Sequence, residues 1–222
     1  KPHEVIDIVT TPDGSPVAMV HCNNCTSDLN AWVNLFKEFE EIMGIPVDMG
    51  KLFTNLFNVA LKGNPDCGGI MSYNYVSGEP VTGFADGRPL FVRSANDKFN
   101  LANFMRAIIS GAISVLKVGN DILFNEEKIK VDRITGHGGL FTTPGVGQRI
   151  LGAALNSPIS CMKTAGEGGP WGMAILASYL INNKKKQSLA EFLDDQVFAG
   201  DTGTSVAPTP EDVAGFNAYI EN

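Results

Sequence analysis

Two glycine clusters, each between a β-rich run and a helical run, are the parts of this sequence best suited to hold a ligand. The first covers residues 136–144 (Gly-His-Gly-Gly-Leu-Phe-Thr-Thr-Pro), and the second covers residues 164–170 (Thr-Ala-Gly-Glu-Gly-Gly-Pro). Because glycine lacks a Cβ atom, the backbone of such a turn can approach a ligand closely. The helix that follows presents unpaired N–H groups and a positive dipole end, which suits an anion or a polar heterocycle.

The position of the two clusters strengthens this interpretation. Both follow strands in successive strand–turn–helix units, and open α/β sheets bind ligands along the carboxyl ends of their strands. Together they favour a nucleotide site, with close packing of the connections as the alternative. The sequence contains neither Gly-x-x-x-x-Gly-Lys-Ser/Thr nor Gly-x-Gly-x-x-Gly, which excludes a P-loop and disfavours a dinucleotide site.

Other residues that could bind a metal or act in catalysis lack suitable partners in the sequence. Cys22 and Cys25 have metal-ligand spacing, but a structural zinc needs four ligands and no second pair occurs, so we expect no metal site. His137 lies inside the first glycine cluster without an evident catalytic partner, which favours a hydrogen-bonding or packing role. Residues 23–27 form a helix start rich in small donors and could be a third ligand-facing edge.

The elements that must position these turns follow from periodicity and from turn residues. Strand–turn–helix alternation in the last third predicts an α/β layered domain. The expected strands are 5–10, 16–21, 69–76, 89–93, 129–135 and 158–162, and the expected helices are 26–43, 49–61, 100–124, 144–156, 171–182, 189–198 and a last one from Thr209. We expect one nucleotide-binding domain over 1–200, followed by a linker and C-terminal helix over 201–222.

Composition excludes several classes of protein. The net charge of −7 repels a phosphate backbone, so nucleic acid is not an expected partner. No apolar stretch reaches the length of a membrane span without interruption, and the segment 104–116 is interpreted as a buried helix. Four scattered cysteines are typical of a reduced, cytoplasmic protein rather than a disulfide scaffold.

The order of four segments resembles the C-terminal domain of the FGGY family of carbohydrate kinases, closest to bacterial xylulokinase-like members. The segments are the helix start 26–32, the run 73–79 (Tyr-Asn-Tyr-Val-Ser-Gly-Glu), Gly138-Gly139 with the following helix, and 164–177. The similarity extends over about residues 5–198. It implies an actin-like ATPase (ribonuclease H-like) domain with a central mixed sheet flanked by helices.

The resemblance also implies ligands and contacts. In such kinases the Gly-Gly turn lies against the adenosine of ATP, which enters with Mg²⁺. The expected nucleotide contacts are therefore Gly138, Gly139, Leu140 and Thr143, with Ser27 and Asn30 lining the same cleft from the helix start at 26.

The catalytic residues are expected outside this chain. In the family the aspartate base and a phosphate-binding hairpin precede the region of resemblance, and a separate N-terminal domain holds most of the sugar. We therefore expect the complete enzyme to transfer the γ-phosphate of ATP to a sugar hydroxyl, with this portion inactive alone. A xylulose-like ketose is the expected substrate, with ribulose, gluconate and glycerol as alternatives.

Two further expectations remain open from the sequence. The same fold could serve instead as a non-catalytic nucleotide-binding or assembly module. A homodimer is possible, with the apolar helix 100–124 at the subunit contact.

Overall fold

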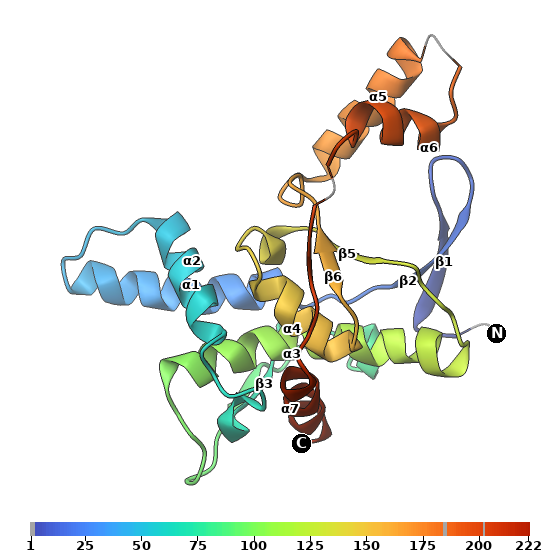
Figure 1. Ribbon diagram of the computed structural model, residues 1–222. Helices are drawn as coiled ribbons and strands as arrows, with labels where there is room; N and C mark the ends of the chain where they lie inside the picture. Colours follow the sequence, from blue (N-terminus) through green and yellow to red (C-terminus); the bar gives the residue numbers. More distant parts are fainter. Residues whose placement is uncertain (1–2, 184–185, 202) are drawn as a thin grey trace.

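Helix α3 (Leu101–Asp121) runs through the middle of the structure, and most other elements pack around it (Figure 1). The computed structural model describes residues 3–183, 186–201 and 203–222. Within them the strands are β1 (Ile6–Thr10), β2 (Pro16–Val20), β3 (Met71–Tyr73), β4 (Leu90–Val92), β5 (Ile134–Gly136), β6 (Ile159–Cys161) and β7 (Thr204–Val206). The other α-helices are α1 (Thr26–Ile42), α2 (Met49–Ala60), α4 (Val146–Leu155), α5 (Gly169–Asn182), α6 (Leu189–Phe192) and α7 (Pro210–Glu221).

The helices expected from the sequence are all present, and five of the six expected strands are present in shorter form. The expected strand 129–135 is mostly irregular, and β5 begins only at Ile134. The first two strands form the expected antiparallel hairpin around Gly14, whose φ of 89° needs a residue without a Cβ atom. The long helix continues after α3 as a π-helical turn, η3 (Ile122–Glu126), and the expected helix 189–198 consists of α6 followed by the π-helical turn η5 (Leu193–Val197).

The expected single central sheet is not what the described residues form. Strands β1 and β2 make one antiparallel sheet, β3 and β4 make a second, and β5, β6 and β7 make a third, mixed sheet. In the mixed sheet β5 and β6 are parallel, whereas β6 and β7 are antiparallel. Among the described residues, no strand of one sheet pairs with a strand of another.

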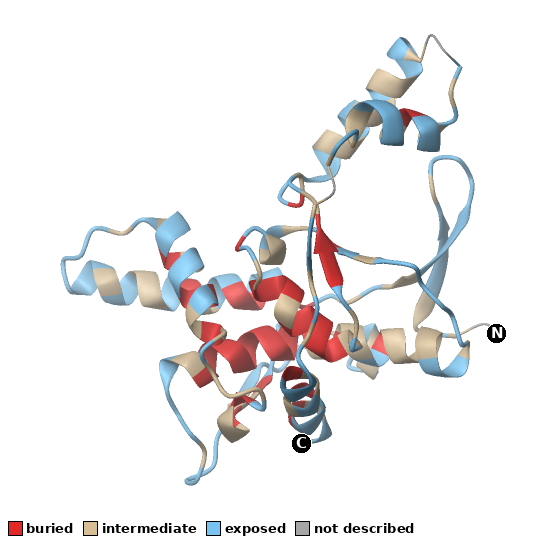
Figure 2. Cartoon of the chain, viewed as in Figure 1, coloured by how far each residue is buried: buried red, intermediate tan, exposed pale blue. Residues whose placement is uncertain are grey.

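The core is built on α3, whose residues 103–113 are all buried (Figure 2). Apolar residues of α1, α2, α4 and α7 pack against it, and Trp32, Phe91 and Phe104 form a cluster of aromatic rings. Residues 101–126 are long and apolar enough to cross a membrane by length and composition alone. Burial of residues 103–113 makes α3 the central helix of the domain.

Close packing between α3 and β3 depends on Gly111. A Cβ atom at this position would lie 2.4 Å from the carbonyl oxygen of Ser72. We expect Gly111→Ala to lower the free energy of unfolding by about 1–3 kcal/mol, the usual cost of overpacking a core. Urea denaturation measures this loss. Gly172→Ala on α5, where a Cβ atom meets nothing within 4 Å, is the matched control and should show no loss.

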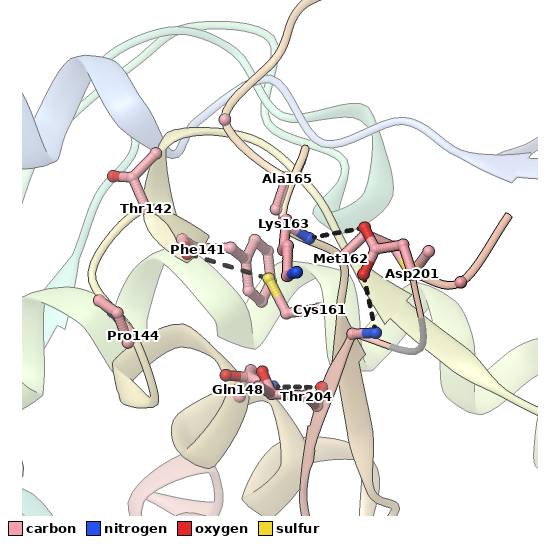
Figure 3. Close-up of a pocket in the computed structure, with 13 residues that line it drawn as sticks. Phe141, Thr142, Pro144, Gln148, Cys161, Met162, Lys163, Ala165, Asp201 and Thr204 are labelled. Carbon is pink, nitrogen blue, oxygen red and sulfur yellow. Dashed lines mark hydrogen bonds between the residues drawn. The ribbon is translucent and has the colours of Figure 1, made fainter. Parts of the chain in front are cut away.

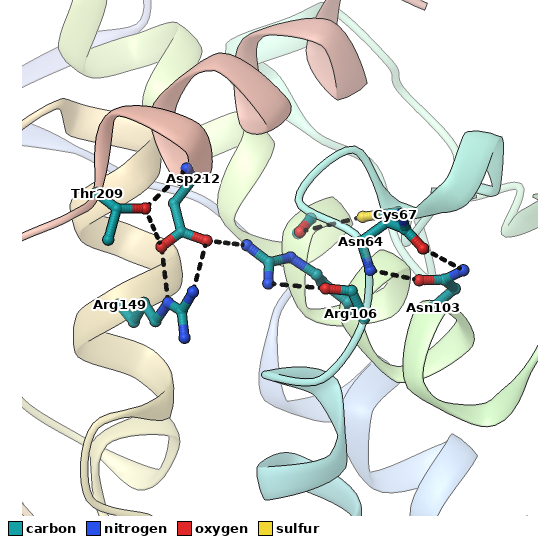
Figure 4. A network of polar contacts seen from close by, with 9 residues as sticks. Asn64, Cys67, Asn103, Arg106, Arg149, Thr209 and Asp212 are labelled. Atoms are coloured by element: carbon teal, nitrogen blue, oxygen red, sulfur yellow. Dashed lines mark hydrogen bonds and ion pairs between the residues drawn. The ribbon is translucent and has the colours of Figure 1, made fainter.

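The last segment contributes more than a linker and a helix. Residues 204–206 form β7, which the sequence did not indicate and which completes the mixed sheet. The expected helix follows as α7, with Thr209 as N-cap and Pro210 in its first turn. Its Asp212 is wholly buried and pairs with Arg106 of α3 and Arg149 of α4 (Figure 4). The C-terminal residues are thereby tied into the core.

Two apolar elements remain outside this core. Every residue of the β1–β2 hairpin is exposed or half-buried, and Ile8 is 70% exposed. Helix α5 has no buried residue, although its sequence is strongly apolar, and Leu180 and Ile181 are 81% and 78% exposed. In Figure 1, α5 and α6 project from one end of the mixed sheet.

Candidate functional site

The two glycine turns lie together at one edge of the mixed sheet. Strands β5 and β6 are parallel, with Gly136 opposite Cys161, so both strands end on the same side. Beyond this pair, the backbone N–H of Gly138 donates a 2.7 Å hydrogen bond to the carbonyl oxygen of Ala165. The expectation that both turns share one edge is therefore confirmed, and the two turns are directly joined.

The glycines of the first turn have two different roles. A Cβ atom at Gly136 would lie 2.2 Å from the ring of Phe141, so this glycine lets the ring fold back against β5. At Gly138 and Gly139 a Cβ atom would meet nothing within 4 Å, so packing does not explain them. Gly138 also has a φ of 100°, which side-chain-bearing residues rarely adopt. Bare backbone therefore faces open space at Gly138 and Gly139, where a ligand could approach it closely.

A pocket of about 420 Å³ lies beside the two turns (Figure 3), within the size range of small-molecule sites. Residues of both turns line it, but Gly138 and Gly139 do not. Its walls come from the turn after β5, the start of α4, the end of β6 and the loop before β7. The lining residues are Phe141, Thr142, Pro144, Gln148, Cys161, Met162, Lys163, Ala165, Gly166, Gly200, Asp201, Gly203 and Thr204.

The floor of the pocket is held by Gln148. Its side-chain amide donates to the carbonyl oxygens of Ile159 and Thr204, both at 3.0 Å, and so bridges β6 and β7. Its carbonyl oxygen accepts from the backbone N–H of Gly145 at 3.3 Å. Because Gln148 is buried and committed to these bonds, it shapes the pocket rather than offering free groups to a ligand.

The polar groups of the pocket sit at its rim. Asp201 accepts hydrogen bonds from the backbone N–H groups of Lys163 and Gly203, at 3.3 and 3.0 Å, which fixes the loop before β7. Lys163 is exposed and contributes the only cationic side chain among the lining residues. Burial raises the pKa of the Cys161 thiol, so the thiol is protonated at neutral pH. The arrangement suits a flat, partly apolar ligand with a negative group near Lys163.

Two of the expected contact residues have little exposed side chain. Thr143 is buried at 5% exposure, and its neighbours Thr142 and Pro144 line the pocket instead. Leu140, in the 3-10 turn η4 (Gly139–Phe141), packs its side chain against the hydrophobic core. Neither Leu140 nor Thr143 lines the pocket.

The other expected contacts, Ser27 and Asn30, are exposed on the first turns of α1. Figure 1 shows α1 in blue, on the side of the domain that also carries the start of α4. Leu29 of α1 belongs to the core cluster against which Leu140 packs, which brings the two elements onto one core. The start of α1 and the glycine turn are thus built on the same core.

His137 does not line this pocket. It is exposed and lines a second hollow of about 400 Å³ together with Arg133, Thr135 and Trp171. Within the described residues no three His, Cys, Asp or Glu side chains converge, and Cys22 and Cys25 are half-buried free thiols.

Sequence reasoning missed the pocket's far wall, formed by Asp201, Gly203 and Thr204. A signal was present, because Asp two residues before Gly is typical of a turn in which the carboxylate accepts a backbone N–H. The β-branched residues that follow suit a strand. Nothing in the sequence places this loop beside β6, since the pairing partners lie 43 (Cys161↔Thr204) to 47 (Ile159↔Val206) residues earlier along the chain.

Solved structures of sugar kinases share this fold. A ligand-bound xylulose kinase from Lactobacillus acidophilus matches with a TM-score of 0.70 and 21% identity, over 98% of this chain and 41% of that chain. A gluconate kinase from the same organism matches with a TM-score of 0.56 and 23% identity, over 75% of this chain and 33% of that chain. Plasmodium falciparum glycerol kinase with ADP matches with a TM-score of 0.53 and 18% identity, again over 75% of this chain and 33% of that chain. At these identities the likeness shows the fold.

The chain spans less than half the length of these kinases, and comparison with curated protein sequences gave no match. The model of one protein family matches residues 1–181, which is most of the chain. By this match the chain belongs to the FGGY family of carbohydrate kinases, and the matched residues are its C-terminal domain.

Proposed function

We propose that this chain is the ATP-binding portion of a carbohydrate kinase that transfers the γ-phosphate of ATP to a hydroxyl of a xylulose-like ketose. The observation that carries the proposal is the pair of joined glycine turns, with bare backbone at Gly138 and Gly139 beside the 420 Å³ pocket. The xylulose kinase likeness over nearly the whole chain supports the choice of sugar. The fold is proposed to be the ribonuclease H-like, actin-like ATPase type.

The adenosine of ATP is proposed to lie on the glycine turn. Gly138 and Gly139 would contact it through their backbone, as would Leu140 and Thr143, whose side chains are turned into the protein. Ser27 and Asn30 would approach from the start of α1. The Lys163 ammonium group at the pocket rim would attract the phosphates, since opposite charges favour each other most where water is partly excluded.

Mg²⁺ is proposed to arrive with ATP. Magnesium in kinase sites is usually held by one or two carboxylates, by water and by the substrate phosphates. Asp201 is the acid among the residues that line the pocket, and both its oxygens already accept backbone N–H groups. This chain's residues therefore fit binding of the nucleotide more than a dedicated metal site.

Phosphoryl transfer is proposed to need a further domain, because it depends on positioning and on neutralising the γ-phosphate. The exposed apolar hairpin β1–β2 and the exposed apolar face of α5 are surfaces that such a domain could cover. The share of the related kinases that this chain spans, 41% for the xylulose kinase, supports the same view. The domain would supply the catalytic base and most contacts with the sugar.

A cytoplasmic location and a homodimer stay predictions. All four cysteines are free, which suits a reducing compartment. A non-catalytic nucleotide-binding or assembly module remains the second candidate function. The bare glycine backbone favours it as much as it favours the kinase, because both need the nucleotide site.

The proposal predicts nucleotide binding without turnover. ADP or ATP should raise the melting temperature of this chain, by an amount equivalent to about 2.7 kcal/mol at a concentration 100 times the Kd. NAD should give no shift. Sugar-dependent release of ADP by this chain alone would contradict the expected inactivity. The same assay on the protein joined to its proposed further domain separates a kinase from a non-catalytic module.

A further inference from the structure

A cluster of polar residues with a buried centre ties the turn before α1 to the segment after β3. Its members are Asn23, Asn24, Asn74, Ser77 and Glu79, which we call the Glu79 cluster. The Glu79 side chain is wholly buried, and Asn24 and Asn74 are 2% and 1% exposed. The two halves of the cluster are 50 to 56 residues apart in sequence.

The hydrogen bonds of the cluster converge on Asn23 and Asn24. One carboxylate oxygen of Glu79 accepts from the backbone N–H of Asn23 at 3.0 Å and from the side-chain amide of Asn24 at 3.1 Å. The backbone N–H of Ser77 donates to Asn24 Oδ1, and Asn74 Nδ2 donates to the Asn24 carbonyl, both at 2.8 Å. The two residues just before Cys25 are thereby held on several sides.

This matters because α1 lacks a side-chain cap of its own. The N-cap is Cys25, whose side chain accepts no hydrogen bond from the first turn. Capping side chains normally fix how a chain enters a helix. In α1, the Glu79 cluster holds the residues that enter the helix, and so sets where its first turn lies.

Glu79 is itself firmly placed. Its backbone N–H donates to the carbonyl of Phe84 at 2.7 Å, and the N–H of Phe84 donates back at 3.1 Å. A Cβ atom at Gly78 would lie 2.3 Å from the carbonyl oxygen of Ala85, so the loop is closely packed. The second carboxylate oxygen, Oε1, has no hydrogen-bond partner within the described residues. Burying such a group costs stability, which points to a role other than stability alone.

We propose that Glu79 is a positioning residue for the nucleotide site, holding the first turn of α1 against the glycine turn through Asn23 and Asn24. The inference rests on the proposed function, and deepens it by naming what places Ser27 and Asn30. Leu29 of α1 belongs to the core cluster against which Leu140 of η4 packs, so movement of the first turn of α1 would change how Ser27 and Asn30 face the glycine turn.

A double-mutant cycle on the purified chain tests this positioning role. Isothermal titration gives the Kd for ADP of the wild type, Glu79→Ala, Asn30→Ala and the double variant. We expect Glu79→Ala to weaken ADP binding about threefold to tenfold, the range of couplings carried through protein structure. In the Asn30→Ala background the added effect of Glu79→Ala should largely vanish, because the two changes act through the same contact. Glu79→Gln, which can keep the two accepted hydrogen bonds, should restore most of the affinity.

A control variant separates positioning from stability. Asp48 caps α2 by accepting from the backbone N–H of Lys51, so Asp48→Ala removes a helix cap away from the glycine turn. It should lower the melting temperature without changing the Kd for ADP. Should Glu79→Ala prove too unstable to titrate, Asn23→Ala, which removes the bond to the Gly78 carbonyl from an exposed side chain, is measured in its place.

The outcomes distinguish the two proposals. A wild-type chain that does not bind ADP overturns the proposed function, and the positioning role with it. A wild type that binds ADP, with an unchanged Kd in Glu79→Ala and Asn23→Ala, overturns the positioning role alone. Fully additive effects of Glu79→Ala and Asn30→Ala would mean that Glu79 does not act through the start of α1, and would also overturn it.

Discussion

Asp212→Ala should destabilise this domain more than any other single change considered. The Asp212 carboxylate accepts from Arg106 Nη2 at 2.7 Å and from Arg149 Nε and Nη2 at 2.7 and 3.1 Å, and the Thr209 hydroxyl donates to it at 2.9 Å (Figure 4). Because Arg106 is only 2% exposed, removing the Asp212 carboxylate leaves the positive charge of Arg106 buried and unpaired. Breaking a buried ion pair in this way costs about 3–5 kcal/mol.

Denaturant unfolding measures this loss, with Glu191→Ala as the control. Glu191 also accepts hydrogen bonds at a helix start, from Ser188, but it does so in an exposed capping box. Its removal should cost far less. Equal losses for the two variants would mean that the buried network around Asp212 contributes no more to the free energy of unfolding than an exposed helix cap does.

The Asp212 carboxylate also makes the stability of the domain depend on pH in acid. Burial opposes its ionisation, but hydrogen bonds from Arg149, Arg106 and Thr209 outweigh burial and lower the pKa of Asp212 to about 2. Because the folded-state pKa is below the unfolded value near 3.8, the ionised group stabilises the fold above pH 4. That contribution, about 2 kcal/mol, is lost as the pH falls from about 4 towards 2. A pH series of unfolding free energies should show this slope in the wild type and lack it in Asp212→Ala.

Gly139→Val should remove nucleotide binding while leaving the fold intact. A Cβ atom at Gly139 meets no protein atom within 4 Å, and its backbone is not in the left-handed region, so the side chain adds no strain. It would, however, occupy the space in which we propose that adenosine lies. Losing close backbone contact should cost about 2–3 kcal/mol, or roughly 30- to 150-fold in the Kd for ADP.

The control for this experiment is Gly50→Val on the first turn of α2. There too a Cβ atom has room, the nearest atom being Asp48 Oδ1 at 3.4 Å, and the site lies on a different element from the glycine turns. Titration of both variants with ADP, after checking that each melts as the wild type does, isolates the effect of the site. Unchanged affinity in Gly139→Val would show that the nucleotide does not lie on this turn.

Local patterns were enough to predict most elements and the glycine turns. Each turn is marked by a short run of glycines, and Gly138 has a φ of 100°, which favours glycine. The cap and first turn of α7 follow from Thr209, Pro210 and the acids after them, which lie within one helical turn. The meeting of the two glycine turns was also predictable, because successive parallel strands end at the same edge.

Tertiary structure alone decided what surrounds these turns. The pocket's far wall depends on β7 pairing with β6, and the burial of the Thr143 side chain depends on how η4 packs on the core. Asp212 has the local signature of an ordinary first-turn acid, yet it pairs with Arg106 at a separation of 106 residues. Glu79 likewise reaches Asn23 from another part of the chain. Such contacts depend on the relative placement of whole elements, which side-chain burial and packing determine and which no short stretch of sequence encodes.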